Sequence, residues 1–408
     1  MESSEIDEPR KEPGKANHLP KLLSPADLPD NFTRSLYKIA PYKGCAHGCR
    51  YCDGRAERYY IEGDFERDIE IRQNIPGRLA AELPIVRERG MIAFGSGVTD
   101  PYQPLESDNT ITSRCAQLLA ESPHALPALV MTKSNLATRD LPFWKRLNER
   151  TGFVLLVSLT SLDESLRETM EPGASSFASR LDMIRRFKVA GCSVGVLAMP
   201  FLPGLSDGED SIRTLYAACT IAGVDFVMPG GLTLRPGRQK EFYLRALNSY
   251  RPELLGPTSE LYREEHSSGS PCFATSRALF TRIAPIRREF AMPYLLPHKI
   301  FSRILPPHDS IRILFRDMLE LYAERNIDIG ALARSAKAYD AWLISLRRVF
   351  RRKRNLPYIW LGERFNKATI DGELDTILGN KRLSRFVTTI LHEGACLDYL
   401  TLKLEQNP

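Results

Sequence analysis

The segment YKGCAHGCRYC (residues 42–52) places three cysteines, Cys45, Cys49 and Cys52, within eight residues. It follows an apolar stretch, residues 35–40, that we predict to be a strand. In a chain of 408 residues, a tight cysteine cluster indicates metal binding or catalysis rather than a disulfide framework. The segment therefore predicts a metal-binding or catalytic loop directly after the first strand.

Further apolar runs follow this loop, each a continuous block bounded by Gly, Pro, Asn or Asp. Continuous blocks suit strands that are buried on both faces. Segments with helical spacing lie between them, and this alternation predicts a parallel sheet with crossover helices, consistent with a full or partial (β/α) barrel. The expected strands are 91–97, 128–134, 153–159, 193–201 and 225–231, and the expected helices are 112–121, 141–150, 176–190 and 211–222.

The alternation stops near residue 240, and a helical pattern takes over from about residue 308. We therefore expect an α/β chain with a partial (β/α)6-type barrel and a helical C-terminal region. The expected parts are a mostly disordered tail, a core domain and a helical region, at 1–30, 31–290 and 291–408. Within the helical region, the pattern predicts helices over 309–326, 330–354 and 369–404.

Composition excludes several classes of protein. The chain is 43% hydrophobic and 26% charged, which excludes a wholly disordered or collagen-like chain. No apolar stretch approaches the roughly 18 to 20 residues that cross a bilayer, and the N-terminus lacks the apolar core of a secretory signal. We expect a soluble, cytoplasmic protein with no membrane partner. The formal charge of +6 permits an anionic partner without requiring one.

Three thiolates on one short loop can converge on one face of an iron–sulfur cluster. With four irons, one iron would lack a protein ligand and could bind a small chelating molecule, because no fourth cysteine lies near in sequence. The main alternative is zinc, which usually takes four ligands, with His47 as the fourth in a cramped loop. A redox pair with a bystander cysteine, or three structural cysteines, fit a glycine-rich basic loop less well.

The spacing C-x3-C-x2-C resembles the radical S-adenosylmethionine (SAM) superfamily, and Tyr51 fits the aromatic position that lies near the adenine. The resemblance implies a [4Fe–4S] cluster on Cys45, Cys49 and Cys52, with the amino and carboxylate groups of SAM on the open iron. It implies that one electron, from a donor such as flavodoxin or ferredoxin, cleaves SAM to methionine and a 5′-deoxyadenosyl radical. That radical abstracts a hydrogen atom from the substrate.

A narrower resemblance, to the spore photoproduct lyase-like family, covers about residues 35–237. In the lyase proper, a DNA repair enzyme, a thymine dimer is split and a cysteine returns a hydrogen atom to the product. That cysteine would fall at about Gly97, and no cysteine lies between Cys52 and Cys115, so we expect a relative with a different substrate. The motifs that carry this resemblance are Tyr42-x-Gly-Cys45, Tyr51-Cys52, TDPYQPLE (99–106), TKSN (132–135) and Arg139-Asp140.

The strand ends supply the candidate SAM contacts. By resemblance, Gly95-Ser96-Gly97 stands where the methionine amino group binds, and a glycine-rich strand end lets backbone approach a ligand. Thr99 could hydrogen-bond the ribose or the amino acid part. The alternatives are an ordinary turn at Gly95 and a turn or helix cap at Asp100.

Three later strand ends complete this set. Lys133 ends an apolar run and needs a counter-charge, for which the SAM carboxylate is a candidate. Ser158 could bind the ribose hydroxyls or the carboxylate, and Met199 stands near where adenine packs. The alternatives are a lysine that reaches solvent, a serine that caps a helix and a core methionine.

Other charged residues have less specific interpretations. Arg235 could hold an anionic group of the substrate, whereas Glu106 and Glu171 are expected to form surface salt bridges. The run RRVFRRKR (347–354) carries six cations in eight residues. It predicts either a phosphate-binding patch for nucleic acid or a solvated helix end.

The sequence thus predicts a radical SAM enzyme whose leading substrate is a nucleic-acid base or lesion. One alternative is a radical SAM enzyme that acts on another macromolecule or a small molecule. Another is a non-enzymatic module with a structural metal and an RNA-binding helix. A structural metal would not need Lys133 and Ser158 at successive strand ends, so this set of residues distinguishes the two classes. No separate catalytic residue is predicted.

Overall fold

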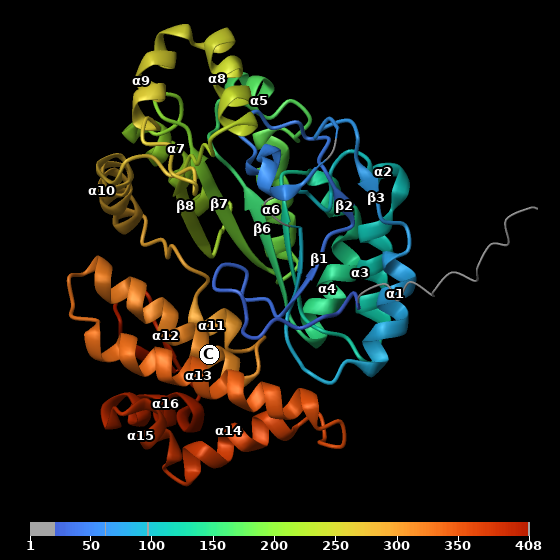
Figure 1. Ribbon diagram of the computed structural model, residues 1–408, viewed down its shortest axis with the longest axis vertical. Coiled ribbons are helices and arrows are strands. Elements are labelled where there is room, and N and C mark those ends of the chain that lie inside the picture. The colour runs from blue at the N-terminus through green and yellow to red at the C-terminus, as the bar shows by residue number, and fades with distance from the viewer. Residues whose placement is uncertain (1–20, 62, 96–97, 407–408) are drawn as a thin grey trace, which may run out of the picture.

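The computed structural model describes residues 21–61, 63–95 and 98–406. Its centre is a six-stranded parallel sheet in the order β1-β4-β5-β6-β7-β8 (Figure 1). These strands match the six predicted ones, and the predicted α/β class with a partial barrel is confirmed. Their bounds are β1 Tyr37–Ile39, β4 Ile92–Phe94, β5 Ala128–Thr132, β6 Phe153–Ser158, β7 Ser193–Phe201 and β8 Phe226–Gly231.

Helices that alternate with the strands cover one face of the sheet. Their apolar side chains and those of the strands form a single core, which includes Trp144 and Phe187. The four predicted helices are present, with ends that differ by at most two residues. The helices of this core are α1 Ile75–Glu82, α3 Ile111–Glu121, α4 Leu141–Arg150, α6 Phe177–Val189 and α7 Glu209–Ile221. The short helix α5 Glu164–Met170 instead places Leu166 and Met170 in a separate apolar cluster.

The opposite face of the sheet packs against the C-terminal region. Ala93, Leu129 and Leu156 share a core with Phe301 and Leu314 from α11 (His298–Phe301) and α12 (Pro307–Glu324). The sheet is therefore buried on both faces, which explains the continuous apolar runs of its strands. Along the chain, three helices follow the last strand of the sheet and precede α11. They are α8 Arg238–Tyr250, α9 Leu255–Leu261 and α10 Phe273–Glu289.

The end of the chain is more broken than predicted. The expectation of one helix over residues 369–404 is wrong, because Gly372 and Gly379 adopt positive φ angles of 73° and 58° and separate shorter helices. The remaining elements are α13 Gly330–Arg352, α14 Trp360–Ile370, α15 Glu373–Leu378, α16 Lys381–Glu393, β9 Ala395–Leu397 and β10 Leu404–Gln406, with β2 Tyr42–Lys43, β3 Glu70–Ile71 and α2 Glu106–Asn109 nearer the N-terminus.

Residues 21–36, here called the N-terminal strap, run along the molecule before β1. The backbone N–H of Leu23 donates to Glu82 at 2.8 Å, and Arg312 donates to the carbonyl of Pro29 at 2.5 Å. Of the tail expected to be disordered, residues 21–30 are therefore held by the core and by α12. Residues 1–20 lie outside the described residues.

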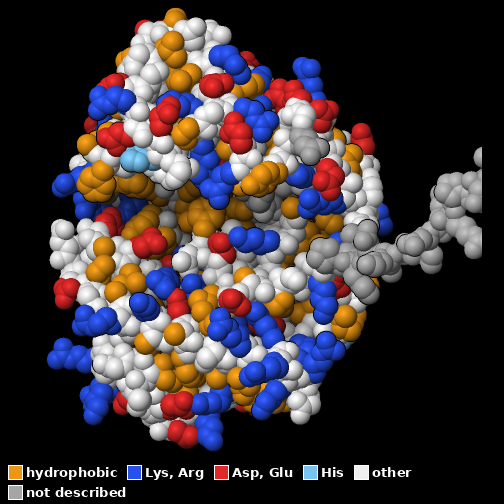
Figure 2. All heavy atoms as spheres, viewed as in Figure 1, with side chains coloured by type: hydrophobic (Ala, Val, Ile, Leu, Met, Phe, Trp, Pro, Cys, Tyr) orange, Lys and Arg blue, Asp and Glu red, His pale blue; other side chains and the backbone are white. Residues whose placement is uncertain are grey.

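The basic run at the end of α13 is partly internal. Arg347 is fully buried and bonds the carboxylates of Glu88 and Asp309 at 2.5 and 2.7 Å. Arg351 also bonds Glu88, at 2.9 Å. These two cations form neither a phosphate-binding patch nor a solvated helix end, because their ion pairs with Glu88 join α13 to the barrel. Figure 2 shows other Lys and Arg side chains on the surface of the C-terminal helices.

Within the described part of the chain, no helix has the length and apolar character needed to cross a membrane.

Candidate functional site

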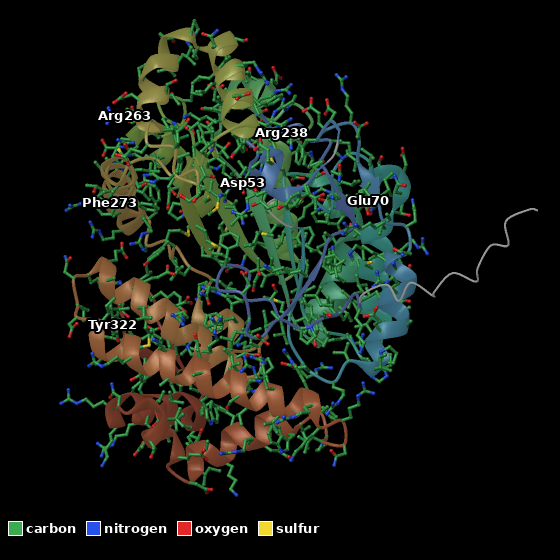
Figure 3. The ribbon with its side chains drawn as sticks, in the orientation of Figure 1. Asp53, Glu70, Arg238, Arg263, Phe273 and Tyr322 are labelled. Atoms are coloured by element: carbon green, nitrogen blue, oxygen red, sulfur yellow. The ribbon has the colours of Figure 1, made fainter. Side chains whose placement is uncertain are left out.

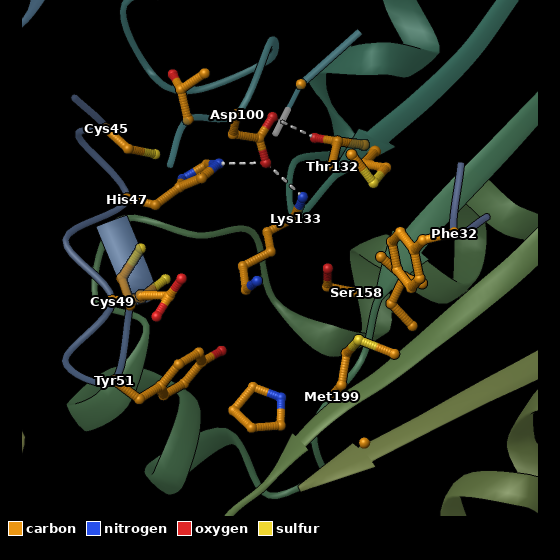
Figure 4. A pocket seen from close by; sticks show the side chains of 18 of the residues that line it. Phe32, Cys45, His47, Cys49, Tyr51, Asp100, Thr132, Lys133, Ser158 and Met199 are labelled. Atoms are coloured by element: carbon orange, nitrogen blue, oxygen red, sulfur yellow. Dashed lines mark hydrogen bonds and ion pairs between the residues drawn. The ribbon is translucent and has the colours of Figure 1, made fainter. Parts of the chain in front are cut away.

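A cavity of about 530 Å³ opens at the C-terminal ends of the parallel strands. The three clustered cysteines line it, together with most of the predicted strand-end residues (Figure 4). Ser96 falls outside the described residues. The predicted SAM contacts that line the cavity are Tyr51, Gly95, Thr99, Lys133, Ser158 and Met199.

The cysteine loop is shaped by glycines and closed by backbone hydrogen bonds. Gly48 has a φ of 62°, and a Cβ there would lie 2.7 Å from a carboxylate oxygen of Glu66. The N–H of Cys45 donates to Phe65 at 3.0 Å, and that of Cys52 donates to Cys49 at 3.3 Å. All three thiols are free of disulfides. The loop thus presents three thiols to one cavity.

The TDPYQPLE block braces this loop. The Thr99 hydroxyl donates to the carbonyl of Gly44 at 2.9 Å, so its proton is engaged within the protein. The Gln103 amide accepts from the N–H of Ala46 at 2.8 Å and donates to Gly44 at 3.3 Å. The most specific motif of the sequence therefore holds the cysteine loop in place.

Asp100 joins the loop to the end of β5. Its carboxylate accepts from the hydroxyl of Thr132 at 2.8 Å and the N–H of Lys133 at 2.7 Å, and it lies 3.1 Å from Nε2 of His47. Burial would raise the pKa of Asp100, but His47 and the backbone donors hold it below its usual value. The other ring nitrogen of His47 lies 2.9 Å from the carbonyl of Gly173. The Gly173 carbonyl engages Nδ1, and Nε2 faces the Asp100 carboxylate, an arrangement that does not favour His47 as a fourth zinc ligand.

Glu106 is fully buried, so the expected surface salt bridge is wrong. Arg139 donates to its carboxylate at 3.0 Å, and the hydroxyl of Tyr42 donates to it as well. The N–H groups of Ile111 and Ser113 also donate, each at 3.1 Å, which satisfies the start of α3. Glu106 thus ties strand β2, which precedes the cysteine loop, to this helix.

Glu171 is also buried, against expectation, and forms a network with Tyr51 and Arg180. Arg180 donates to the Glu171 carboxylate at 2.5 Å and to the carbonyl of Ser158 at 2.8 Å, while the Tyr51 hydroxyl donates to Glu171. Burial would raise the pKa of Glu171, but Arg180 and Lys133 outweigh it and lower that pKa. Sequence reasoning missed Arg180. The only sequence signal for its role is the position of a cation on the apolar face of the predicted helix 176–190.

Lys133 points into the cavity between the cysteine loop and Ser158 (Figure 4). Its Nζ lies 5.8 Å from the centre of the Tyr51 ring and, within the described residues, has no hydrogen-bond or ion-pair partner. Burial would lower the pKa of Lys133, but Cys49 and Glu171 raise it above its usual value. Lys133 is therefore a charged ammonium group suited to an anionic ligand.

Other predicted residues have structural partners. Gly95 has a φ of 92°, and a Cβ there would lie 2.9 Å from Pro101, so packing requires glycine. Arg235 donates to Asp53 at 2.6 Å and to Ser267 at 2.7 Å, so its guanidinium is occupied by the loop after the cysteines. Figure 3 shows Asp53 on that loop, near Arg238 at the start of α8.

The chemistry of the thiols fits an iron–sulfur cluster. Burial raises the pKa of Cys49 to about 12 and also raises those of Cys45 and Cys52, so the bare thiols stay protonated near neutral pH. Coordination to a metal deprotonates a thiol outright and offsets this cost.

A family model described as the radical SAM superfamily matches residues 39–215. An uncharacterized protein of Mycobacterium tuberculosis is 32% identical over 251 residues, covering 60% of this chain and 71% of that protein. An uncharacterized protein of Acidianus two-tailed virus is 28% identical over 198 residues, covering 45% and 63%. A structure of spore photoproduct lyase complexed with dinucleoside spore photoproduct matches at a TM-score of 0.46 and 15% identity, covering 63% and 74%.

The matched residues include the cysteine loop and the strands β4, β5, β6 and β7 of the sheet, beginning at the last residue of β1. The chain therefore belongs to the radical SAM superfamily, whose enzymes use a [4Fe–4S] cluster and SAM.

Proposed function

We propose that Cys45, Cys49 and Cys52 hold the [4Fe–4S] cluster of this enzyme and that SAM binds beside them in the cavity. The observation that carries the proposal is the meeting of three cysteine side chains and the charged Lys133 in one cavity. When bound, the cluster and SAM supply reductive cleavage of a C–S bond and abstraction of a hydrogen atom. An electron donor such as flavodoxin or ferredoxin is the proposed reductant.

The side chains around the cavity have separate proposed tasks. Lys133 binds the carboxylate of SAM, and the hydroxyl of Ser158 contacts its ribose or carboxylate. Tyr51 is held by Glu171 and lies against the adenosine part. Asp100 keeps the cysteine loop and the backbone of Lys133 in a fixed relation through its hydrogen bonds. The protein thus orients the cofactors, and they carry the chemistry.

We propose a nucleic-acid base or lesion as the leading substrate, supported by the net charge of +6 and the TDPYQPLE block. The cavity argues against dimer splitting that needs a cysteine hydrogen donor. Among the described residues that line it, the only cysteines are the three assigned to the cluster. This observation favours hydrogen abstraction from a substrate other than a thymine dimer. The RNA-binding module loses support, because Arg347 and Arg351 serve internal ion pairs.

Cluster assembly tests the proposed ligands. The protein would be reconstituted anaerobically with iron and sulfide, and bound iron would be counted together with the visible absorption of the cluster. We expect about four irons per chain, the content of a [4Fe–4S] cluster. Cys45→Ala, Cys49→Ala and Cys52→Ala should each lose it. Cys115→Ala, which changes a buried cysteine of α3 outside the cavity, is the matched control and should keep it. Uptake of one zinc and no iron would contradict the assignment.

A further inference from the structure

The cavity has two chemically different halves. The polar half holds the cysteine loop, His47, Asp100 and Lys133. The apolar half, as defined here, is lined by Phe32, Ala93, Met131, Leu197 and Met199. Figure 4 shows Cys45, Cys49, His47 and Asp100 on one side, Phe32 and Met199 on the other, and Ser158 between them.

Most charges on the cavity wall are already neutralised. Asp30 pairs with Lys38 at 3.0 Å, and Asp53 pairs with Arg235 at 2.6 Å. The five residues of the apolar half carry no ionisable group. Burial of an unpaired charge against such a wall is costly, because no polar group there replaces its hydration. A ligand group that enters this half is therefore uncharged.

Phe32 stands on a turn that local hydrogen bonds fix. The Asp30 carboxylate accepts from the N–H groups of Phe32 at 2.9 Å and Thr33 at 2.8 Å, and the N–H of Asp30 donates to Ser35 at 2.8 Å. The Phe32 ring lines the cavity but keeps 38% of its surface exposed. A large apolar ring left open on a cavity wall is a contact surface for a ligand.

Side chains of the C-terminal region hold this turn in place. Arg34, which is buried, bonds Asp317 of α12 at 2.7 Å, and the hydroxyl of Tyr399 donates to the same carboxylate at 2.6 Å. The turn carrying Phe32 is therefore held by the helices that also cover the sheet. Through this link, the C-terminal region shapes the wall of the cavity.

We propose that the apolar half binds an uncharged, planar part of the substrate, and that Phe32 contacts it directly as a specificity-determining residue. This inference rests on the proposed function, which assigns the polar half to the cluster and SAM. Charged parts of the substrate remain outside the apolar half. Planarity follows from the Phe32 ring, since aromatic rings pack best against other flat groups.

Two probes of similar shape test the inference: indole, which is uncharged, and indole-3-acetate, which is anionic. Binding to the full-length, cluster-loaded protein would be measured by ligand-observed NMR, with and without SAM. We expect indole to bind in both states and indole-3-acetate at least tenfold more weakly. Phe32→Ala should weaken indole binding by about three- to tenfold, the range of one aromatic contact, and Phe32→Tyr should restore it.

Controls separate this inference from a folding defect and from the proposed function. Tyr358→Ala removes an exposed aromatic ring outside the cavity and should leave indole binding unchanged. Met131→Gln adds a polar group to the apolar half and should also weaken indole binding. This second variant keeps the test valid if Phe32→Ala lowers the melting temperature of the protein. Cys49→Ala should abolish SAM cleavage and keep indole binding, so the two claims can fail independently. Equal affinity for both probes, displacement of indole by SAM, or an unchanged affinity in Phe32→Ala would overturn the inference.

Discussion

Lys133 is the residue on which the SAM assignment depends most. Its ammonium group stays charged and faces the cavity. Within the described residues, this group has no hydrogen-bond or ion-pair partner. Hydrogen bonds to charged groups contribute about 1.5 to 3 kcal/mol, so Lys133→Met should weaken SAM binding by about ten- to hundredfold. Isothermal titration of SAM into the reconstituted protein measures this. Lys145→Met, on an exposed helix, is the control, and equal affinities in the two variants would contradict the role.

Glu171 is predicted to matter for stability as well as for the site. Glu171→Gln would leave the buried guanidinium of Arg180 without its counter-charge, and breaking a buried pair costs about 3 to 5 kcal/mol. Urea unfolding should show a loss of this size. The double variant Glu171→Gln, Arg180→Met should recover much of it, because both charges are gone. A single variant as stable as the wild type would show that the network is weak.

At the scale of elements, the TDPYQPLE block acts as a brace. Gln103 is fully buried and makes hydrogen bonds to both Gly44 and Ala46 of the cysteine loop. Gln103→Leu keeps a similar volume but removes these bonds and leaves buried backbone groups unpaired. We expect lower iron content after reconstitution and faster loss of the cluster in air. Gln117→Leu, on the exposed side of α3, should behave as the wild type.

The strands and most helices were predictable because their signals are local. A strand covered on both faces needs a continuous apolar run, and β6 is buried along its whole length. Parallel strands also bring their C-terminal ends together, so Lys133 and Ser158 were placed at one edge without knowledge of contacts. The C-terminal helices were less predictable, because the αL turns at Gly372 and Gly379 break a pattern that stays amphipathic throughout.

Other parts of the site depend on contacts that spacing does not reveal. Glu171 and Arg180 look like surface residues until the fold buries them together. Phe32 lies just after the segment that composition assigns to a disordered tail, and its turn is fixed by hydrogen bonds to Asp30 and by the ion pair between Arg34 and Asp317. Arg34 and Asp317 are 283 residues apart in sequence, so no local pattern indicates that pair.

At the scale of the whole molecule, the packing of the C-terminal region should be sensitive to acid. His298 is fully buried and accepts the N–H of Leu397 at 3.0 Å, and burial lowers its pKa from 6.5 to about 4. Its contribution to stability is complete above pH 6.5 and is lost as the pH falls toward 4, because the unfolded chain binds the proton first.

This shift amounts to about 2 to 3 kcal/mol between pH 7 and pH 4.5. Urea unfolding of the wild type and of His298→Asn at these two pH values measures it, and the variant should lose less stability on acidification. Part of the slope should remain, since burial also lowers the pKa of His308. Identical slopes for the two proteins would exclude His298 as a source of the acid sensitivity.

Reductive cleavage of SAM tests the central claim most directly. The wild type and Cys49→Ala would be reconstituted anaerobically, reduced with dithionite and incubated with SAM, and 5′-deoxyadenosine would be quantified. We expect 5′-deoxyadenosine from the wild type and none from Cys49→Ala. A wild type that holds a full cluster and binds SAM, yet yields no more 5′-deoxyadenosine than the variant, would contradict the proposed chemistry.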